Sequence, residues 1–319
     1  MENRQALPNF FIVGAPKSGT TSLYHCLDQH PEIYMSPVKE PSFFASDIRL
    51  ELLSHEARPL IRHDPRELRA YLDGPMQEKG LAALVLEWED YLKLFKNVQN
   101  ETAIGEASVC YLWSETAALN ILQRVPAAKI IMVLRNPVER AFSQYLQALA
   151  SGWVRATFRE LVELDARRNL KGFSILYPFL DYGRYHIQVQ RYLETFTADR
   201  VRIYLYEEYK LQTLAVFEDI FRFLNVAADF QVDVSKKYME PLLPRFSALG
   251  FVLRRQSFLK KTREVVPYPV RKVLRVLGFS RRETTTMDPN DRAYLVDLYR
   301  DDIRRLSGLL GRDLSMWLK

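Results

Sequence analysis

Short runs of apolar residues, each followed by a helical pattern of apolar and polar positions, recur along this chain. The first run covers Phe10–Val13, and the apolar positions within 23–27 then share one face of a helix. The run at 129–134 is continuous and rich in β-branched residues, which is typical of a strand buried on both faces of a parallel sheet. A third run, at 201–206, predicts another strand of the same sheet.

Helical periodicity fills much of the remaining sequence. It predicts helices over 187–196, 213–224 and 288–306, and a further helix that begins near Val138. Strands that alternate with helices predict a P-loop-like, doubly wound, mainly parallel α/β sheet flanked by helices. The 319 residues contain no repeat, low-complexity tract or clear linker, so we expect a single domain over 1–319.

The composition narrows the class of protein. Hydrophobic residues make up 48% and charged residues 26%, as in water-soluble globular proteins. Two cysteines, Cys26 and Cys110, predict buried thiols in a reducing compartment. The sequence shows no signal-peptide pattern and no apolar run near the ~20 residues of a spanning helix, so we expect a cytoplasmic protein. The net charge of +6 favours anionic ligands, and we expect no nucleic-acid partner.

The loop after the first predicted strand has the chemistry of an anion site. Residues 14–21 read Gly-Ala-Pro-Lys-Ser-Gly-Thr-Thr. A loop between a strand and a helix N-terminus presents backbone N–H groups and the positive end of the helix dipole. Gly14 and Gly19 permit close backbone approach, and Lys17 adds a cation. Further hydroxyl donors come from Ser18, Thr20 and Thr21.

This loop departs from the P-loop of nucleoside-triphosphate enzymes, in which a Lys directly follows the second Gly. Here Lys17 comes two residues before Gly19, and no clear apolar strand ends in a magnesium-binding Asp. A kinase or another P-loop nucleotide enzyme is therefore disfavoured, and ATP hydrolysis or magnesium dependence would support it. A plain turn that needs its glycines only for geometry is the remaining alternative.

The loop resembles instead the 5′-phosphosulfate loop of sulfotransferases that use 3′-phosphoadenosine-5′-phosphosulfate (PAPS), in particular their bacterial and heparan-sulfate-type branch. The resemblance implies that Lys17 contacts the oxygen between phosphorus and sulfur and stabilises the leaving group. It also implies that the donor is bound by Pro16, Lys17, Ser18, Gly19, Thr20 and Thr21.

A second motif begins where the strand at 129–134 ends. Residues 135–145 resemble the family's 3′-phosphate motif, in which an Arg at a strand end and a Ser eight residues later clamp the phosphate. The resemblance assigns these roles to Arg135 and Ser143. Ligands of open α/β sheets bind at the carboxyl ends of the strands, and Arg can bind a phosphate with two parallel hydrogen bonds. Tyr206, in another family-like segment, completes the candidate donor-binding residues.

The resemblance also indicates a general base. Residues 37–44 resemble the family's Glu-x-x-Phe-Phe segment, in which the Glu removes the acceptor proton. Glu40 is the candidate, with a surface Glu beside Lys39 as the alternative interpretation and His186 as the reserve base. Some relatives carry a Lys where this chain has Ala107, so any help from that Lys is missing here or comes from elsewhere.

Together these residues predict a sulfotransferase that moves the sulfonate of PAPS to an acceptor hydroxyl or amine and releases adenosine 3′,5′-bisphosphate (PAP). We expect no metal, because no Cys/His cluster has ligand spacing. The acceptor class stays open among small molecules, carbohydrates and lipid-linked compounds, and the sequence does not indicate an oligomeric state. A non-catalytic PAP-binding protein of the same fold is the second alternative, and the presence of both Lys17 and Glu40 argues against it.

The last distinctive feature is a basic segment at about 245–283, which we expect to be helical. From Arg245 to Arg282 it contains eleven Lys or Arg residues and one acidic residue, Glu264. Three interpretations stay open: a lid that receives an anionic or lipid-linked acceptor, a peripheral membrane contact, and plain scaffold. Beyond it, residues 301–317 resemble the closing helix of bacterial family members.

Overall fold

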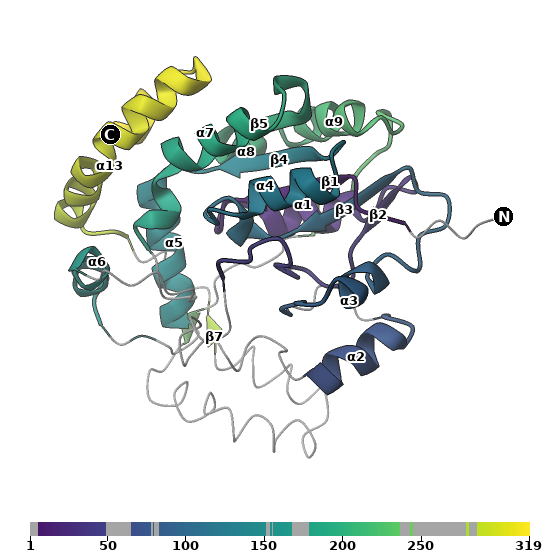
Figure 1. Ribbon diagram of the computed structural model, residues 1–319. Coiled ribbons are helices and arrows are strands. Elements are labelled where there is room, and N and C mark those ends of the chain that lie inside the picture. Colours follow the sequence, from purple (N-terminus) through teal and green to yellow (C-terminus); the bar gives the residue numbers. More distant parts are fainter. Residues whose placement is uncertain are drawn as a thin grey trace.

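A five-stranded parallel sheet forms the centre of the computed structural model (Figure 1). The structure describes residues 6–48, 65–77, 79, 83–150, 154, 156–167, 179–236, 243–244, 279–280 and 286–319. The strand order is β2-β3-β1-β4-β5. The strands are β1 (Phe10–Gly14), β2 (Ile33–Met35), β3 (Ala103–Ala107), β4 (Lys129–Leu134) and β5 (Val201–Leu205).

Helices cover both faces of this sheet. Side chains of α1, α8 and α9 pack in one core cluster, and side chains of α3, α4, α5, α7 and α13 pack in the other. Figure 1 shows α13 along the outside of α5 and α7, beyond the sheet. The helices are α1 (Thr20–Leu27), α2 (Pro65–Asp73), α3 (Trp88–Lys93), α4 (Ala117–Arg124), α5 (Pro137–Ala150), α6 (Phe158–Arg167), α7 (Tyr185–Thr195), α8 (Tyr206–Leu211), α9 (Thr213–Leu224) and α13 (Pro289–Leu310).

The two-faced burial follows from the period of two in the central strands. In β1, Phe10 and Ile12 enter the core under α1 and α9, whereas Phe11 and Val13 enter the core under α5 and α7. All four side chains are fully buried. Because neither face of the strand meets water, the sequence shows a continuous apolar run and not an alternation.

The strand order places a topological switch point beside β1. The chain leaves β1 for β2 on one side of the sheet, and it later adds β4 directly against the other side of β1. Open α/β sheets bind ligands at such a switch point, outside the carboxyl ends of the strands. The predicted doubly wound, parallel fold is therefore confirmed, and the segments that follow β1, β3 and β4 lie at one edge of the sheet.

The ends of several elements test the local predictions. Asp288 caps α13, since its side chain accepts the backbone N–H of Asn290 at 2.7 Å, and Pro289 is the first helical residue. The expectation of a closing helix through residue 317 is wrong, because α13 ends before Gly311, which adopts φ +62°. The strand predicted to include Tyr206 ends one residue earlier, and Tyr206 opens α8.

The predicted basic segment at 245–283 lies outside the described residues, apart from a short strand within it. That strand, β7 (Phe279–Ser280), pairs antiparallel with β6 (Leu243–Pro244). This pairing places residues 243–244 and 279–280 side by side. The three interpretations of the basic segment remain predictions.

Candidate active site

The loop between β1 and α1 bends through two residues with left-handed backbone angles. Lys17 has φ 67° and Gly19 has φ 82°. Glycine adopts this region freely, whereas Lys17 does so at a cost, which is typical of a backbone held for function. The glycine is also required by space, because a Cβ at position 19 would lie 3.1 Å from the ring of Tyr206 and 3.2 Å from that of Tyr209.

The loop also leaves polar groups open for an anion. Ser18 is fully buried, and its hydroxyl oxygen has no hydrogen-bond partner within the described part of the chain. A buried hydroxyl without a partner is costly, so such groups usually serve a ligand or an ordered water. Gly19 provides α1 with no side-chain cap, and the first turn of α1 contains no acidic residue. This helix N-terminus suits a bound phosphate.

Lys17 points from the loop to α5. Its Nζ atom donates a hydrogen bond to Oε1 of Gln147 at 2.9 Å. Burial, together with the positive charges of Arg135, Arg140 and Lys39, lowers the pKa of Lys17 to about 8. Three neighbouring cations thus concentrate positive potential at this edge of the sheet.

Arg135 joins the second motif to the first. It follows β4, which pairs directly with β1, and its Nη1 atom donates to the backbone oxygen of Lys17 at 3.0 Å. Its guanidinium also lies over the ring of Tyr206, 4.9 Å from the centroid. The structure therefore brings together the loop, Arg135 and Tyr206 as one cluster.

Ser143 lies on α5 on the same side as this cluster. It is half-buried and precedes Gln147 by four residues, so the two side chains share one face of the helix. Because Gln147 contacts Lys17, this face of α5 is directed toward the loop. Arg140, on the same helix, is fully buried and donates to Oε1 of Gln144, which makes it part of the core and not of a solvated surface.

Glu40 lies in a tight loop beside the end of β3. Its backbone has φ 65°, and its N–H group donates to the oxygen of Ala107 at 2.8 Å. Its carboxylate accepts a hydrogen bond from Nζ of Lys39 at 2.6 Å. The side chains of Lys39 and Glu40 are 10% and 29% exposed, so this is a half-buried pair and not a surface one.

The reserve base is held elsewhere. His186 lies at the start of α7, where its backbone N–H contacts both carboxylate oxygens of Asp302 at 3.2 and 3.3 Å. The charge of Glu40, by contrast, acts on the pKa of Lys17, and its backbone is bonded to the end of β3. The role of each residue as base remains a prediction.

Comparison with known proteins identifies the family. A family model described as the sulfotransferase family matches residues 8–230, which is well over half of the chain. The chain belongs to the sulfotransferase family.

Solved and curated sulfotransferases agree with this assignment. The crystal structure of a sulfotransferase from Alicyclobacillus acidocaldarius is 30% identical, covers 98% of this chain and 100% of its own, and superposes with a TM-score of 0.70. The bifunctional heparan sulfate N-deacetylase/N-sulfotransferase 2 of Mus musculus is 26% identical over 98% of this chain. Carbohydrate sulfotransferase 15 of Homo sapiens is 28% identical over the same share. The chain spans 31% and 55% of the length of these two relatives.

Sequence reasoning missed two residues of this candidate site. Gln147 holds Lys17, and Lys39 places a buried cation beside the loop that is bonded to Ala107. Lys39 therefore precedes the residue that is bonded to Ala107, the position at which the family resemblance implies that a helping Lys is missing. The four-residue spacing from Ser143 could have identified Gln147, whereas the burial of Lys39 has no signature in the sequence.

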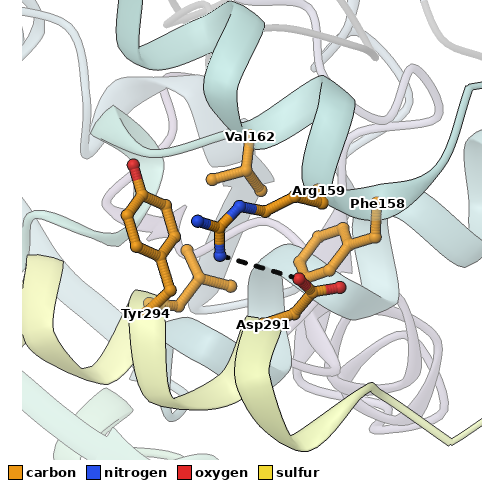
Figure 2. A pocket seen from close by; sticks show the side chains of 6 residues that line it. Phe158, Arg159, Val162, Asp291 and Tyr294 are labelled. Carbon is orange, nitrogen blue, oxygen red and sulfur yellow. Dashed lines mark ion pairs between the residues drawn. The ribbon is translucent and has the colours of Figure 1, made fainter.

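A hollow between α6 and α13 lies apart from these residues (Figure 2). The side chain of Arg159 occupies it, stacked 3.7 Å from the ring centroid of Tyr294 and 3.8 Å from a carboxylate oxygen of Asp291. Phe158 packs from its wall onto Phe142 of α5. The residues that line the hollow therefore come from two helices, α6 and α13, and include none of the predicted site residues.

No group of three or more His, Cys, Asp or Glu side chains in the described ranges could hold a metal ion. No helix within those ranges is both long and apolar enough to cross a membrane.

Proposed function

We propose that the protein transfers the sulfonate group of PAPS to an acceptor hydroxyl or amine and releases PAP. The observation that carries this proposal is the hydrogen bond from Arg135 to the backbone of Lys17. It makes one cationic site from two motifs that are 118 residues apart, and a nucleotide with phosphates at both its 5′ and 3′ positions requires such a site.

The residues present fit this donor. The buried hydroxyl of Ser18 and the N-terminus of α1 would bind the 5′-phosphate, together with Thr20 and Thr21. Arg135 and Ser143 would bind the 3′-phosphate. Tyr206 supports the guanidinium of Arg135 through its ring, which limits the directions from which Arg135 can donate.

The reaction itself needs a base and a stabilised leaving group. Glu40 takes the proton of the acceptor as the acceptor atom forms a bond to sulfur. The bond between sulfur and the bridging oxygen breaks, and its electron pair leaves on that oxygen, where Lys17 stabilises the new negative charge. Lys39 holds the carboxylate of Glu40 in place and adds a second cation on the side of the site where the base lies.

The relatives suggest which acceptor to try first. Two of them are named for heparan sulfate and for carbohydrate, although the chain covers only part of each. We therefore propose a carbohydrate acceptor, with small molecules and lipid-linked compounds as the other classes. This choice does not depend on the roles of Glu40 and Lys17.

The test is an acceptor screen with labelled PAPS, in which wild type is compared with Glu40→Gln and His186→Ala. Glu40→Gln keeps the shape of the base but cannot take a proton, so it should bind PAP normally and lose transfer. His186→Ala should stay active. An active Glu40→Gln beside an inactive His186→Ala would transfer the role of base to His186. A wild type that neither binds PAP nor transfers sulfonate, or that hydrolyses ATP with magnesium, would overturn the proposed function.

A further inference from the structure

A buried carboxyl group lies behind the loop that carries Glu40. Glu106, on β3, is fully buried and has no ion-pair partner among the described residues. It accepts three hydrogen bonds. Ser108 Oγ donates to Oε1 at 2.5 Å, and the hydroxyls of Tyr91 and Tyr111 donate to Oε2 at 2.7 and 3.1 Å.

Two of these hydroxyls, those of Ser108 and Tyr111, also accept hydrogen bonds from the backbone of the loop that carries Glu40. Ser108 Oγ accepts the N–H of Ser42 at 3.0 Å, and the hydroxyl of Tyr111 accepts the N–H of Phe44 at 3.2 Å. A hydroxyl has only one hydrogen, so it can accept from the loop while it donates to Glu106. When Glu106 is ionised, its carboxylate only accepts and therefore sets the direction of both chains of hydrogen bonds.

The loop needs this support because its backbone is strained. Glu40 has φ 65° and Ser42 has φ 57°, and neither is a glycine. Such angles are unfavourable for residues other than glycine and persist only where the surroundings hold them. Ser42 is held further, since its Oγ donates to the backbone oxygen of Glu40 at 3.2 Å and contacts Sγ of Cys110 at 3.3 Å.

Holding the loop with a buried carboxylate lowers the stability of the fold. Burial raises the pKa of Glu106 to about 7, and the three hydroxyl donors offset only part of that effect. Apolar side chains would fill the same space at a lower cost in stability. The feature that they could not provide is a fixed hydrogen-bond direction at Ser42 and Phe44.

We propose that Glu106 is a positioning residue that fixes the loop at 40–44 through Ser108 and Tyr111, and so aims the carboxylate of Glu40 at the acceptor. This inference rests on the proposed function for the role of Glu40. The ordering of the loop itself does not depend on that role.

The two tyrosines provide a matched pair of variants. Tyr91 and Tyr111 donate to the same atom of Glu106, but only Tyr111 also accepts a backbone N–H of the loop. Tyr111→Phe should therefore disturb the loop, whereas Tyr91→Phe removes the same kind of hydrogen bond and should disturb it little. Glu106→Gln should act like Tyr111→Phe, because an amide NH₂ group donates where the carboxylate accepts.

The experiment measures hydrogen exchange at the amides of Ser42 and Phe44, the affinity for PAP, and the kcat and KM of transfer, in wild type and the three variants. Glu106→Gln and Tyr111→Phe should speed exchange at these amides by about tenfold or more, the change that 1.4 kcal/mol gives. They should lower kcat by a similar factor and leave the affinity for PAP unchanged. Tyr91→Phe should stay near wild type in all three measurements.

Two results would overturn the inference. One is a folded Glu106→Gln with wild-type exchange at Ser42 and Phe44. The other is a loss of kcat that is equal in Tyr91→Phe and Tyr111→Phe, which would indicate a general packing role. If the wild-type protein transfers no sulfonate, the proposed function fails, and the exchange data alone then decide whether Glu106 orders the loop.

Discussion

Arg135 contacts the backbone of Lys17 and not its side chain: Nη1 donates to the carbonyl oxygen at 3.0 Å. The side chain of Lys17 is directed instead to Gln147 on α5. The two cations therefore share one site through separate contacts. Substitutions at Lys17 and Arg135 should consequently have different kinetic effects, one on the chemical step and the other on recognition of the nucleotide.

Lys17→Ala should lower kcat by about 10²-fold or more, the scale found when a transition-state donor is removed. The charge on the bridging oxygen develops mainly in the transition state, so the affinity for PAP should fall much less. Single-turnover rates and calorimetry measure the two effects. A variant with near-normal turnover would contradict the assignment of Lys17 as the leaving-group stabiliser.

The affinity for PAP should fall as the pH rises through about 8. Lys17 has a pKa of about 8 in the free protein, so it is a cation below that pH and becomes neutral above it. If an anionic ligand binds the charged form, affinity is full below pH 8 and declines above it, in total by no more than the modest loss that Lys17→Ala causes. Titration calorimetry between pH 7 and 9.5 measures this decline. Lys17→Gln, which has no proton to lose, should give a flatter profile.

Arg135→Ala should remove most of the preference for PAP over AMP. A site built around the 3′-phosphate leaves donors unpaired when that phosphate is missing, so wild type should bind AMP far more weakly. Without Arg135 both nucleotides should bind at similar, weak affinity. Equal affinities in the wild-type protein would show that the 3′-phosphate motif is misassigned.

Gly19→Ala and Gly311→Ala form a matched pair. Both glycines have left-handed angles, φ 82° and φ 62°, so each alanine should cost about 1 kcal/mol of stability. A Cβ at position 19 would press on Tyr206 and Tyr209, whereas nothing lies within 4 Å of a Cβ at position 311. Denaturant unfolding should show a loss in both variants, at least as large for Gly19→Ala, but only Gly19→Ala should weaken the binding of PAP. Weakened binding in both variants would point to a general loss of structure.

The sequence predicted the central elements well where burial alone determines them. The strand at 129–134 and the helix at 213–224 have the predicted bounds, since each carries a strong apolar pattern of one period. By contrast, β3 was not predicted. Its five residues include Gly105 and Glu106, residue types that are more typical of loops than of strands. The glycine is needed in this strand because the ring of Phe10 fills the space that a Cβ at position 105 would occupy.

The residues of the candidate site also divide into those that the sequence predicted and those that only the structure revealed. The loop at 14–21, Arg135 and Glu40 were found because their chemistry is local in sequence, and the structure brings them to one edge of the sheet. Lys39 and Gln147 gain their significance from contacts that only the folded chain creates. The catalytic roles, the acceptor and the cytoplasmic location remain predictions.

The hydrogen bond between Lys17 and Gln147 should affect how fast the nucleotide associates with the site. Gln147 offers an amide oxygen, which carries no net charge, so the hydrogen bond holds the ammonium without neutralising it. Lys17 and Arg135 thus keep an attractive field directed at a polyanion still in solution, and such fields accelerate diffusional encounter. Association with PAP should accordingly slow as added salt shortens the reach of that field to ~10 Å at 0.1 M.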